Sequence, residues 1–157
     1  MKVYEEIGGY QSLKKAFSQK PEEIVEAVKA SGFRGRGGAG FPTGLKWSFL
    51  AKDVFPRYLC CNADESEPGT CKDRELLLKN PHLLIEGMIL CSYACRIETG
   101  YIYLRGEFHD LSLIMDKALA EAHAKGYLGK NILGSGFNLE SHTNLGEGAY
   151  ISGEESA

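Results

Sequence analysis

The apolar residues near the start of the chain recur at the spacing of helices. Between Ile24 and Val28 they follow one side of a stretch that begins at Pro21 and ends at Gly32. Proline suits a first helical turn because its missing N–H needs no partner there, and glycine commonly ends a helix. The pattern therefore predicts a helix from Pro21 to Gly32, preceded by a shorter helix at Tyr10–Phe17.

Three later stretches of the chain have the residue pattern of β-strands. The clearest is Gly100–Arg105, whose aromatic and β-branched residues favour a pleated surface. The compact run Tyr58–Cys61 predicts a buried strand, and Phe137–His142 predicts a third strand.

Helical patterns fill the intervals between these strands. We expect helices at Lys72–Lys79, from Pro81 to about Ile97, and around the apolar repeat Leu111–Ala122. The second of these is almost continuously apolar, which indicates burial between layers. The alternation of helices and strands predicts an α/β fold with a mainly parallel sheet flanked by helices.

The pattern divides the chain into a helical N-terminal segment, residues 1–31, and an α/β domain, residues 32–157. The last residues, from Gly146 to Ala157, resemble a strand-to-helix turn in which the helix has only begun. No later residue caps or buries that helix. We therefore expect the domain to be incomplete at its C-terminus and the chain to be part of a longer protein.

Composition and charge narrow the choice of partners. The 157 residues carry a net charge of −3, so no global field attracts nucleic acid or acidic lipid. The longest apolar run, Leu83–Cys95, contains Glu86 and is too short to cross a bilayer. The 5 cysteines form no C-x-x-C pair and follow no secretory signal, which favours a reducing cytoplasm. Cys91 and Cys95 share a helix face, where two buried thiols are a simpler interpretation than metal ligands.

A glycine-rich stretch, Ser31–Phe49, interrupts the regular pattern with the sequence SGFRGRGGAGFPTGLKWSF. Glycines let backbone N–H groups approach an anion without a Cβ in the way, and Arg34, Arg36 and Lys46 add positive charge. The stretch can therefore form a phosphate cradle, or it can be a flexible surface loop. Because a helix and not a strand precedes it, it is neither a Rossmann fingerprint nor a Walker A loop.

A second polar loop, Asn62–Gly69, follows the strand predicted at Tyr58–Cys61. Its carboxylates Asp64, Glu65 and Glu67 permit three interpretations: a solvated turn, a Mg²⁺ site, or contacts with the hydroxyls and ring edges of a cofactor. Ligands of open α/β sheets bind at the carboxyl ends of the strands, where this loop would face the glycine-rich stretch. That placement favours the third interpretation, with phosphate on one side and a polar edge on the other.

Aromatic residues flank the lysine of the glycine-rich stretch. Phe41 and Phe49 can sandwich a planar base or anchor the stretch in the core, and Trp47 is expected to be an anchor. The 4 histidines are scattered, and none pairs with a serine or cysteine in the sequence. Nucleophilic catalysis therefore has no visible candidate.

Several longer motifs follow one another along the chain. They are SGFRGRGGAGFPTGLKW, CNADESEPGT, PHLLIEGMIL, GYIYLRGE, GYLGKNILG and GAYISGEES. In this order, and over nearly its whole length, the chain resembles the NADH-binding, FMN-carrying 51-kDa subunit of respiratory complex I, the NADH-quinone oxidoreductase. The resemblance implies a Rossmann-like domain that binds FMN, with NADH as the substrate that gives a hydride to the flavin.

The resemblance also implies roles for individual residues. The expected flavin contacts are Gly35, Arg36, Gly37, Gly38, Gly40, Lys46, Asn62, Asp64, Glu65, Tyr150, Gly153 and Glu154. The expected NADH contacts are Phe41, Phe49, Glu67 and Glu155. A carboxylate at Glu155 would repel the 2′-phosphate of NADPH. No catalytic acid, catalytic base or metal ligand is expected, because the hydride chemistry belongs to the cofactor.

The family further implies partners. We expect electrons to pass from NADH through FMN to iron–sulfur subunits of the 24-kDa and 75-kDa types, and on to quinone. The subunit would lie in the peripheral arm of a membrane-bound complex, on the cytoplasmic or matrix side, without inserting into the membrane itself. A [4Fe–4S] cluster is expected only in a full-length member, because the cysteines of this chain do not match its ligands.

Two positions depart from the family pattern. Ser152 stands where a cysteine is usual, and Glu147 adds a negative charge to the run Leu145–Gly148, where the family has R-G-A-G. These departures leave open a truncated paralogue that acts as a non-catalytic binding or assembly module. The same subunit type also occurs as the diaphorase of NAD-reducing hydrogenases and formate dehydrogenases, which is a second alternative.

Overall fold

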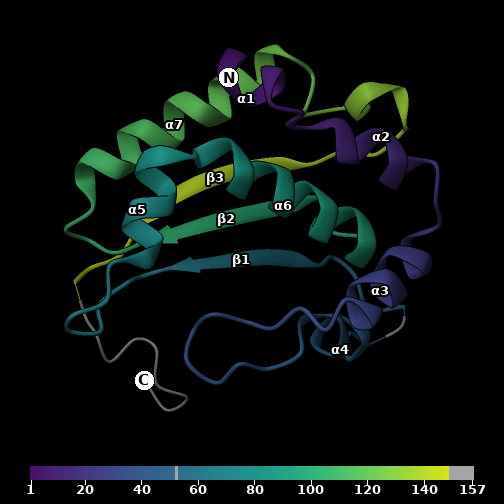
Figure 1. Cartoon of the computed structure of the whole chain (residues 1–157). Coiled ribbons are helices and arrows are strands. Elements are labelled where there is room, and N and C mark those ends of the chain that lie inside the picture. Colours follow the sequence, from purple (N-terminus) through teal and green to yellow (C-terminus); the bar gives the residue numbers. More distant parts are fainter. Residues whose placement is uncertain (52, 149–157) are drawn as a thin grey trace.

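Three parallel strands and the helices around them make up the structure. The computed structural model describes residues 1–51 and 53–148. In chain order the elements are α1 (Lys2–Glu6), α2 (Gln11–Phe17), α3 (Pro21–Ala30), α4 (Thr43–Ser48), β1 (Tyr58–Ala63), α5 (Lys72–Lys79), α6 (Pro81–Cys95), β2 (Thr99–Leu104), α7 (His109–Ala124), a 3-10 turn (Ile132–Gly134) and β3 (Glu140–Leu145). The sheet has the order β1-β2-β3, and each pair of neighbours is parallel (Figure 1). The predicted α/β fold is therefore confirmed.

The register of the sheet brings its carboxyl ends to one edge. Ala63, Leu104 and Leu145 are direct neighbours across the three strands. The backbone pairing continues one residue further, because the Arg105 N–H donates to the Ala63 carbonyl and the Gly146 N–H donates to the Leu104 carbonyl. The loops that follow the strands consequently begin side by side.

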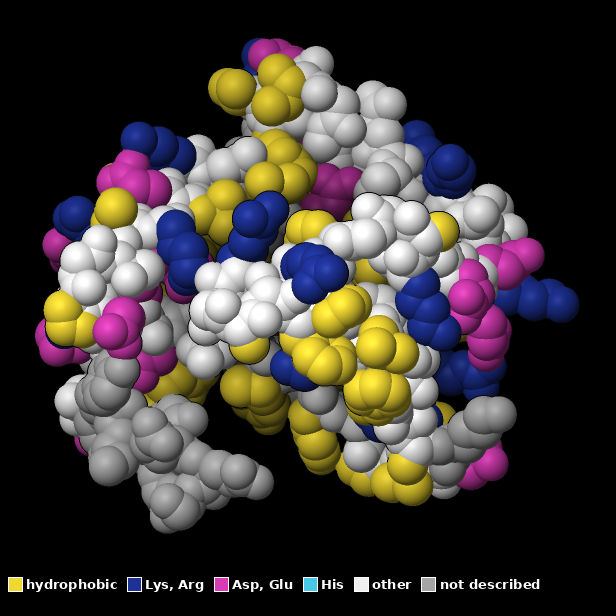
Figure 2. Space-filling view, turned by 60° about the horizontal axis from the view of Figure 1, so that its bottom comes forward, with side chains coloured by type: hydrophobic (Ala, Val, Ile, Leu, Met, Phe, Trp, Pro, Cys, Tyr) yellow, Lys and Arg dark blue, Asp and Glu magenta, His cyan; other side chains and the backbone are white. Residues whose placement is uncertain are grey.

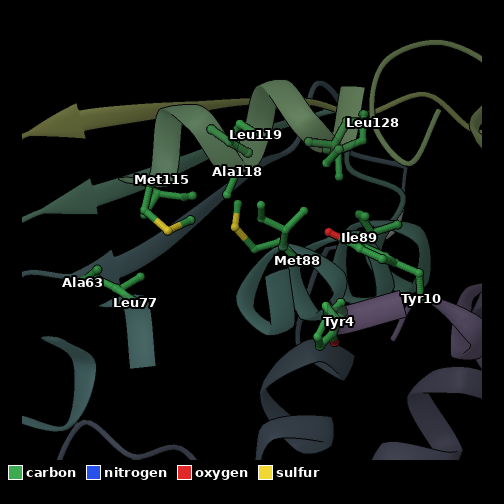
Figure 3. Close-up of a cluster of buried hydrophobic side chains, with 14 of the residues drawn as sticks. Tyr4, Tyr10, Ala63, Leu77, Met88, Ile89, Met115, Ala118, Leu119 and Leu128 are labelled. Carbon is green, nitrogen blue, oxygen red and sulfur yellow. The ribbon is translucent and has the colours of Figure 1, made fainter. Parts of the chain in front are cut away.

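The hydrophobic core lies between one face of the sheet and helices α6 and α7. Figure 3 shows Met88 of α6 directed toward Met115 and Ala118 of α7, while Ile89 of α6 lies on the side of Leu128, and all of these side chains are buried. Ile102 joins this cluster from β2 and is fully buried. Helix α6 also contacts the N-terminal helices on its other side. Its predicted burial between layers is confirmed.

The opposite face of the sheet carries exposed aromatic side chains. Tyr58 is 61% exposed and Tyr101 is 40% exposed, while Leu59 and Ile102 point to the covered face. The prediction of a strand at Tyr58–Cys61 is confirmed, but its burial is wrong. Strand β1 lies at the edge of the sheet. Successive side chains of a strand point to opposite faces, and the described helices cover only one face of this sheet.

Two predicted boundaries were wrong for local reasons. The strand predicted at Phe137–His142 begins only at Glu140, because Leu139 forms an antiparallel bridge with Gly129 and closes the preceding loop. The helix predicted to run to about Ile97 ends two residues earlier, at Cys95, because Arg96 adopts the left-handed conformation with φ 56°. The Ile97 N–H then donates to the Ser92 carbonyl, a bond typical of such helix ends.

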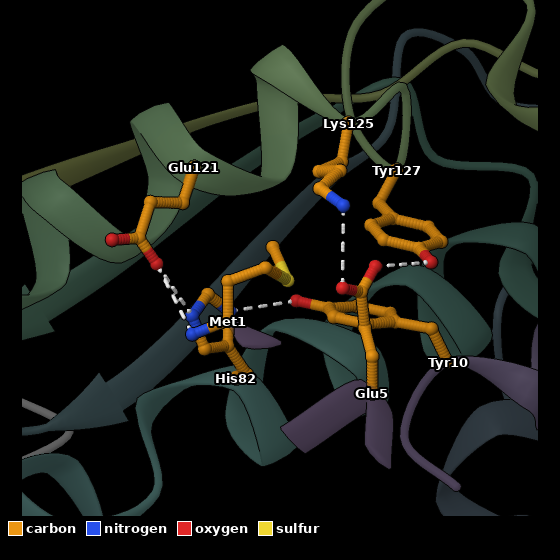
Figure 4. Close-up of polar contacts among 7 residues, drawn as sticks. All are labelled: Met1, Glu5, Tyr10, His82, Glu121, Lys125 and Tyr127. Atoms are coloured by element: carbon orange, nitrogen blue, oxygen red, sulfur yellow. Dashed lines mark hydrogen bonds and ion pairs between the residues drawn. The ribbon is translucent and has the colours of Figure 1, made fainter. Parts of the chain in front are cut away.

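The N-terminal helices share the core of the sheet domain. Helix α1, which the sequence pattern did not predict, places Tyr4 in the main hydrophobic cluster, and Tyr10 follows from the start of α2. The ring of Tyr10 stacks on that of Tyr127, with centroids 4.0 Å apart (Figure 4). Buried Glu86 of α6 accepts hydrogen bonds from the Tyr4 hydroxyl and from the Tyr10 N–H. Segment 1–31 is thus fastened to α6 by both apolar and polar contacts.

Helix α4 packs closely against α3, and this explains one glycine of the glycine-rich stretch. A Cβ added to Gly44 would lie 2.5 Å from the Lys29 nitrogen, so only glycine permits this approach. Trp47, on the same short helix, packs against a small cluster formed by Ala16, Ile24 and Ala94. Its predicted role as an anchor is confirmed.

Candidate functional site

A polar cavity of about 710 Å³ lies at the carboxyl end of β1, between the glycine-rich stretch and the loop after β1. Its lining combines glycines, hydroxyls, an amide, cations and carboxylates: Arg36, Gly37, Gly38, Lys46, Asn62, Asp64, Glu65, Ser66, Glu67, Thr70, Lys72 and Asp73. This volume lies within the range of about 300–1,000 Å³ that is usual for ligand sites. The structure therefore places the two polar loops opposite each other.

The glycine-rich stretch is a closed loop with a hydrogen-bonded neck. The Gly35 N–H donates to the Phe41 carbonyl, and the Thr43 N–H donates to the Phe33 carbonyl, each at 2.9 Å. The Arg34 guanidinium donates to the Gly40 carbonyl at 3.0 Å and so braces the loop from within. These bonds fix the base of the loop and present its tip, which includes Arg36, Gly37 and Gly38, to the cavity.

The loop tip offers bare backbone to the cavity. A Cβ added to Gly37 or Gly38 would meet no protein atom within 4 Å, so side chains at these positions would project into open space. Gly38 also has φ +110°, a conformation that residues with a Cβ rarely adopt. Backbone of this kind can approach an anion such as a phosphate closely.

Three cations surround the cavity. Arg36 lies on the loop tip, Lys46 lies on α4, and Lys72 is the first residue of α5. Sequence reasoning missed Lys72, although its position three residues after the acidic loop was a usable signal. The Lys72 ammonium lies 2.7 Å from an oxygen of Asp73 and 3.7 Å from one of Glu65. Its charge is therefore partly balanced, which leaves Arg36 and Lys46 as the cations beside the glycine backbone.

The loop after β1 is held in one shape by its own side chains. The Asn62 amide oxygen accepts a hydrogen bond from the Asp64 N–H at 3.0 Å, and the Ser66 hydroxyl donates to the Asp64 carboxylate. Glu65 differs from its neighbours because its side chain is only 1% exposed. Burial raises the pKa of Glu65, but hydrogen bonds from two backbone N–H groups and the charge of Lys72 outweigh it and hold the pKa below its usual range.

Two expected NADH contacts, Phe41 and Phe49, lie on the glycine-rich stretch outside the cavity lining. They are 44% and 66% exposed, and their ring centroids lie 6.1 Å apart at 58°. Two parallel rings around a planar base need roughly 7 Å between them, so this pair must reorient before it can form a sandwich. Figure 2, which brings the lower side of Figure 1 forward, shows hydrophobic side chains gathered next to basic ones on this side of the molecule.

The remaining expected residues divide into two groups. Gly35 and Gly40 belong to the neck of the glycine-rich loop and not to the cavity lining. Tyr150, Gly153, Glu154 and Glu155 lie outside the described residues, as does Ser152. Glu147 is described and exposed.

The described residues, 1–51 and 53–148, contain no group of three or more histidines, cysteines and carboxylates arranged to hold a metal ion. The Mg²⁺ interpretation of the acidic loop therefore receives no support from this part of the chain. In the same residues, no helix has both the length and the apolar character needed to cross a bilayer.

A parallel sheet with a glycine-lined polar cavity at the carboxyl end of one of its strands defines a ligand-binding α/β domain. Comparison with known protein families identifies which family of such domains the chain belongs to. The chain belongs to the family of the Nuo51 FMN-binding domain, whose pattern matches residues 28–157.

Similar proteins from bacteria are subunits of one enzyme complex. The chain is 57% identical over 159 residues to an F-type subunit of the NADH-quinone oxidoreductase of Rhizobium meliloti (strain 1021), covering 100% of this chain and 38% of that protein. It is 58% identical over 150 residues to the F-type subunit of Aquifex aeolicus (strain VF5), covering 96% and 35%. The chain thus spans little more than a third of the length of these relatives.

A solved structure has the same fold. A chain of an NAD⁺-reducing [NiFe]-hydrogenase in the H2-reduced state superposes with a TM-score of 0.74 at 40% identity. The match covers 90% of this chain and 24% of the hydrogenase chain. The same fold is therefore part of a larger subunit in that enzyme.

Proposed function

We propose that this chain forms the flavin-binding part of an NADH-oxidising subunit of an NADH-quinone oxidoreductase. The observation that carries the proposal is the cavity between a cationic, glycine-lined loop and an acidic loop, at the carboxyl end of strand β1 of the parallel sheet. Such a cavity suits a ligand with a phosphate at one end and a polar ring or sugar edge at the other. The family of the Nuo51 FMN-binding domain identifies FMN as the ligand of this kind.

The residues of the cavity suit FMN in charge and in hydrogen-bonding groups. Gly37 and Gly38 would present backbone to the phosphate, with Arg36 and Lys46 supplying positive charge. Asn62 and Asp64 lie on the opposite wall, where an amide and a carboxylate can bond hydroxyl and ring N–H groups. When bound, FMN accepts a hydride and releases the two electrons singly. The chain binds, orients and shields the reactants.

NADH is the proposed substrate. Phe41 and Phe49 would bind its adenine after a change in the relative orientation of their rings, and Glu67, which lines the cavity, would contact the dinucleotide. Glu155 is proposed to accept a ribose hydroxyl and to select NADH over NADPH by charge. Electrons would then pass to iron–sulfur subunits of the same complex and on to quinone, with a [4Fe–4S] cluster supplied by the part of the relatives that this chain does not span.

A second candidate function is the diaphorase part of an NAD-reducing hydrogenase. The structural match to such an enzyme, with a TM-score of 0.74 at 40% identity, supports this candidate. Both candidates need the same FMN and NADH sites and differ only in the partner subunits. A non-catalytic assembly module remains the alternative to both.

Quenching of FMN fluorescence on titration with the 157-residue chain tests the binding step. The oxidation step is tested in a chimera in which this chain replaces the matching residues of the Aquifex aeolicus relative, by ferricyanide reduction with NADH. We expect FMN binding by the chain and NADH-dependent reduction by the chimera. A folded chimera that retains neither FMN nor NADH would contradict the proposal and favour the assembly module.

A further inference from the structure

Glu65 uses both oxygens of its carboxylate inside the protein. One accepts a hydrogen bond from the Asp73 N–H at 2.8 Å, and the other accepts one from the Arg74 N–H at 3.0 Å. The side chain is 1% exposed, although it lies in the wall of a large cavity. Its oxygens therefore face α5 and not the cavity.

These two bonds replace a cap that α5 lacks. The first N–H groups of a helix have no partner within it, and a side chain at the N-cap position usually supplies one. The N-cap residue of α5 is Cys71, which makes no such bond. Glu65, eight residues before Asp73, takes its place from the far end of the loop that connects β1 to α5, and thereby ties the start of that loop to the first turn of the helix.

The main chain of Glu65 is held from a second direction. The Arg105 guanidinium, directly after β2, donates to the Glu65 carbonyl at 3.1 Å. Arg105 is itself fixed by Glu107, whose carboxylate accepts bonds from two of its nitrogens at 2.8 and 3.0 Å. The loop is thus tied to α5 by a side chain and to the end of β2 by its backbone.

We infer that Glu65 is a positioning residue, which holds the loop carrying Asn62 and Asp64 in the shape that faces the glycine-rich loop. This role differs from the flavin contact that the family resemblance implies for Glu65. The inference rests on the proposed FMN site for its functional consequence, but the tether itself is a property of the FMN-free chain. Asp64 and Asn62, whose side chains line the cavity, remain the groups that touch the ligand.

Hydrogen exchange of the 157-residue chain without FMN tests the tether, and FMN fluorescence titration tests its consequence. In Glu65→Ala, the amides of Asp73 and Arg74 should exchange about tenfold faster or more, and the dissociation constant for FMN should rise by about tenfold. Asp64→Ala should weaken FMN binding without changing those two amides. Glu75→Ala, which removes an exposed carboxylate from the same helix, should change neither measurement.

A double variant separates the tether from simple helix capping. Cys71→Asp in the Glu65→Ala background supplies α5 with a local cap. It should restore protection of Asp73 and Arg74 but leave FMN binding weak, because the loop remains untied. Full recovery of FMN binding would overturn the positioning role.

Two further outcomes are decisive. If Glu65→Ala weakens FMN binding while both amides keep their protection, Glu65 contacts the flavin directly and the inference is wrong. If neither the wild-type chain nor the folded Aquifex aeolicus chimera that carries it binds FMN, the proposed function fails, while the exchange data still decide whether the tether exists.

Should Glu65→Ala not fold, Glu65→Gln replaces it: the amide side chain keeps one acceptor oxygen, so one of the two N–H groups should lose its protection.

Discussion

His82 and Glu121 join helix α6 to helix α7, with the His82 Nε2 atom 3.1 Å from a Glu121 carboxylate oxygen (Figure 4). The other ring nitrogen of His82 lies 3.0 Å from the Tyr10 hydroxyl, and the side chain is 6% exposed. Burial lowers the pKa of His82, and the neighbouring Glu121 opposes this only in part. The folded protein therefore favours the neutral ring.

This arrangement makes stability depend on pH. A histidine whose pKa is lowered by folding binds a proton more readily in the unfolded chain, so acid favours unfolding. The contribution of His82 is complete above its ordinary pKa of 6.5 and is lost as the pH falls below that value. Urea midpoints should therefore be lower at about pH 5.5 than at about pH 7.5. Glutamine can form hydrogen bonds but does not titrate in this range. In His82→Gln the difference between the urea midpoints at the two pH values should therefore be smaller than in the wild type.

The control for this measurement is His109→Gln. His109 is exposed at the start of α7, and its replacement should leave the pH dependence as in the wild type. An unchanged dependence in His82→Gln would show that other groups cause it.

Glu86 is expected to be important for the packing of the N-terminal helices. Its carboxylate accepts hydrogen bonds from Tyr4, Tyr10 and Ser12. Glu86→Ala would leave buried donors without an acceptor, which should cost roughly 2–4 kcal/mol of the free energy of unfolding. Glu26→Ala removes an exposed carboxylate from α3 and should change stability by less than about 0.5 kcal/mol. Equal losses in the two variants, measured by urea denaturation, would contradict this role.

Two glycine-to-alanine substitutions should have opposite effects. In Gly44→Ala the new methyl group would meet the Lys29 backbone at 2.5 Å, and such overpacking costs about 1–3 kcal/mol. Gly87 lies in the exposed side of α6 with no atom within 4 Å of an added Cβ, so Gly87→Ala should stabilise the protein by about 0.5–1 kcal/mol. Thermal unfolding of both variants checks the sign. A stabilised Gly44→Ala protein would show that α3 and α4 do not pack as described.

The sequence allowed most of the fold to be predicted, because its signals are local. Pro21 and the apolar spacing after it identify α3, and the β-branched and aromatic run at Gly100–Arg105 identifies β2. Helix α1 escaped prediction because five residues show too little periodicity and its stability comes from contacts of Tyr4 with distant residues. The position of β1 at a sheet edge likewise depends on strand order, which no local pattern specifies.

The candidate site, like the fold, has features that local sequence predicts and features that depend on contacts between distant residues. The glycine-rich and acidic loops were recognisable by composition, and the position of the acidic loop at the carboxyl end of the sheet followed from its place after a strand. The bonds of Glu65 to Asp73 and Arg74 were not predictable, since a run of three similar carboxylates does not reveal which one turns inward. The mutual contact of Phe41 and Phe49 also depends on three-dimensional positions that spacing leaves open.

Lys46 provides the most direct test of the cavity as a flavin site. Its side chain lies in the cavity lining beside Gly37 and Gly38, where the proposal places the phosphate. Lys46→Glu replaces attraction with repulsion, and since a hydrogen bond to a charged group is worth roughly 1.5–3 kcal/mol, FMN binding should weaken by about tenfold or more. Lys14→Glu makes the same change of charge on α2, outside the lining, and should bind FMN as the wild type does. Fluorescence titrations of both variants at low and high salt measure the effect, and equal retention of FMN in the two would exclude Lys46 from the phosphate site.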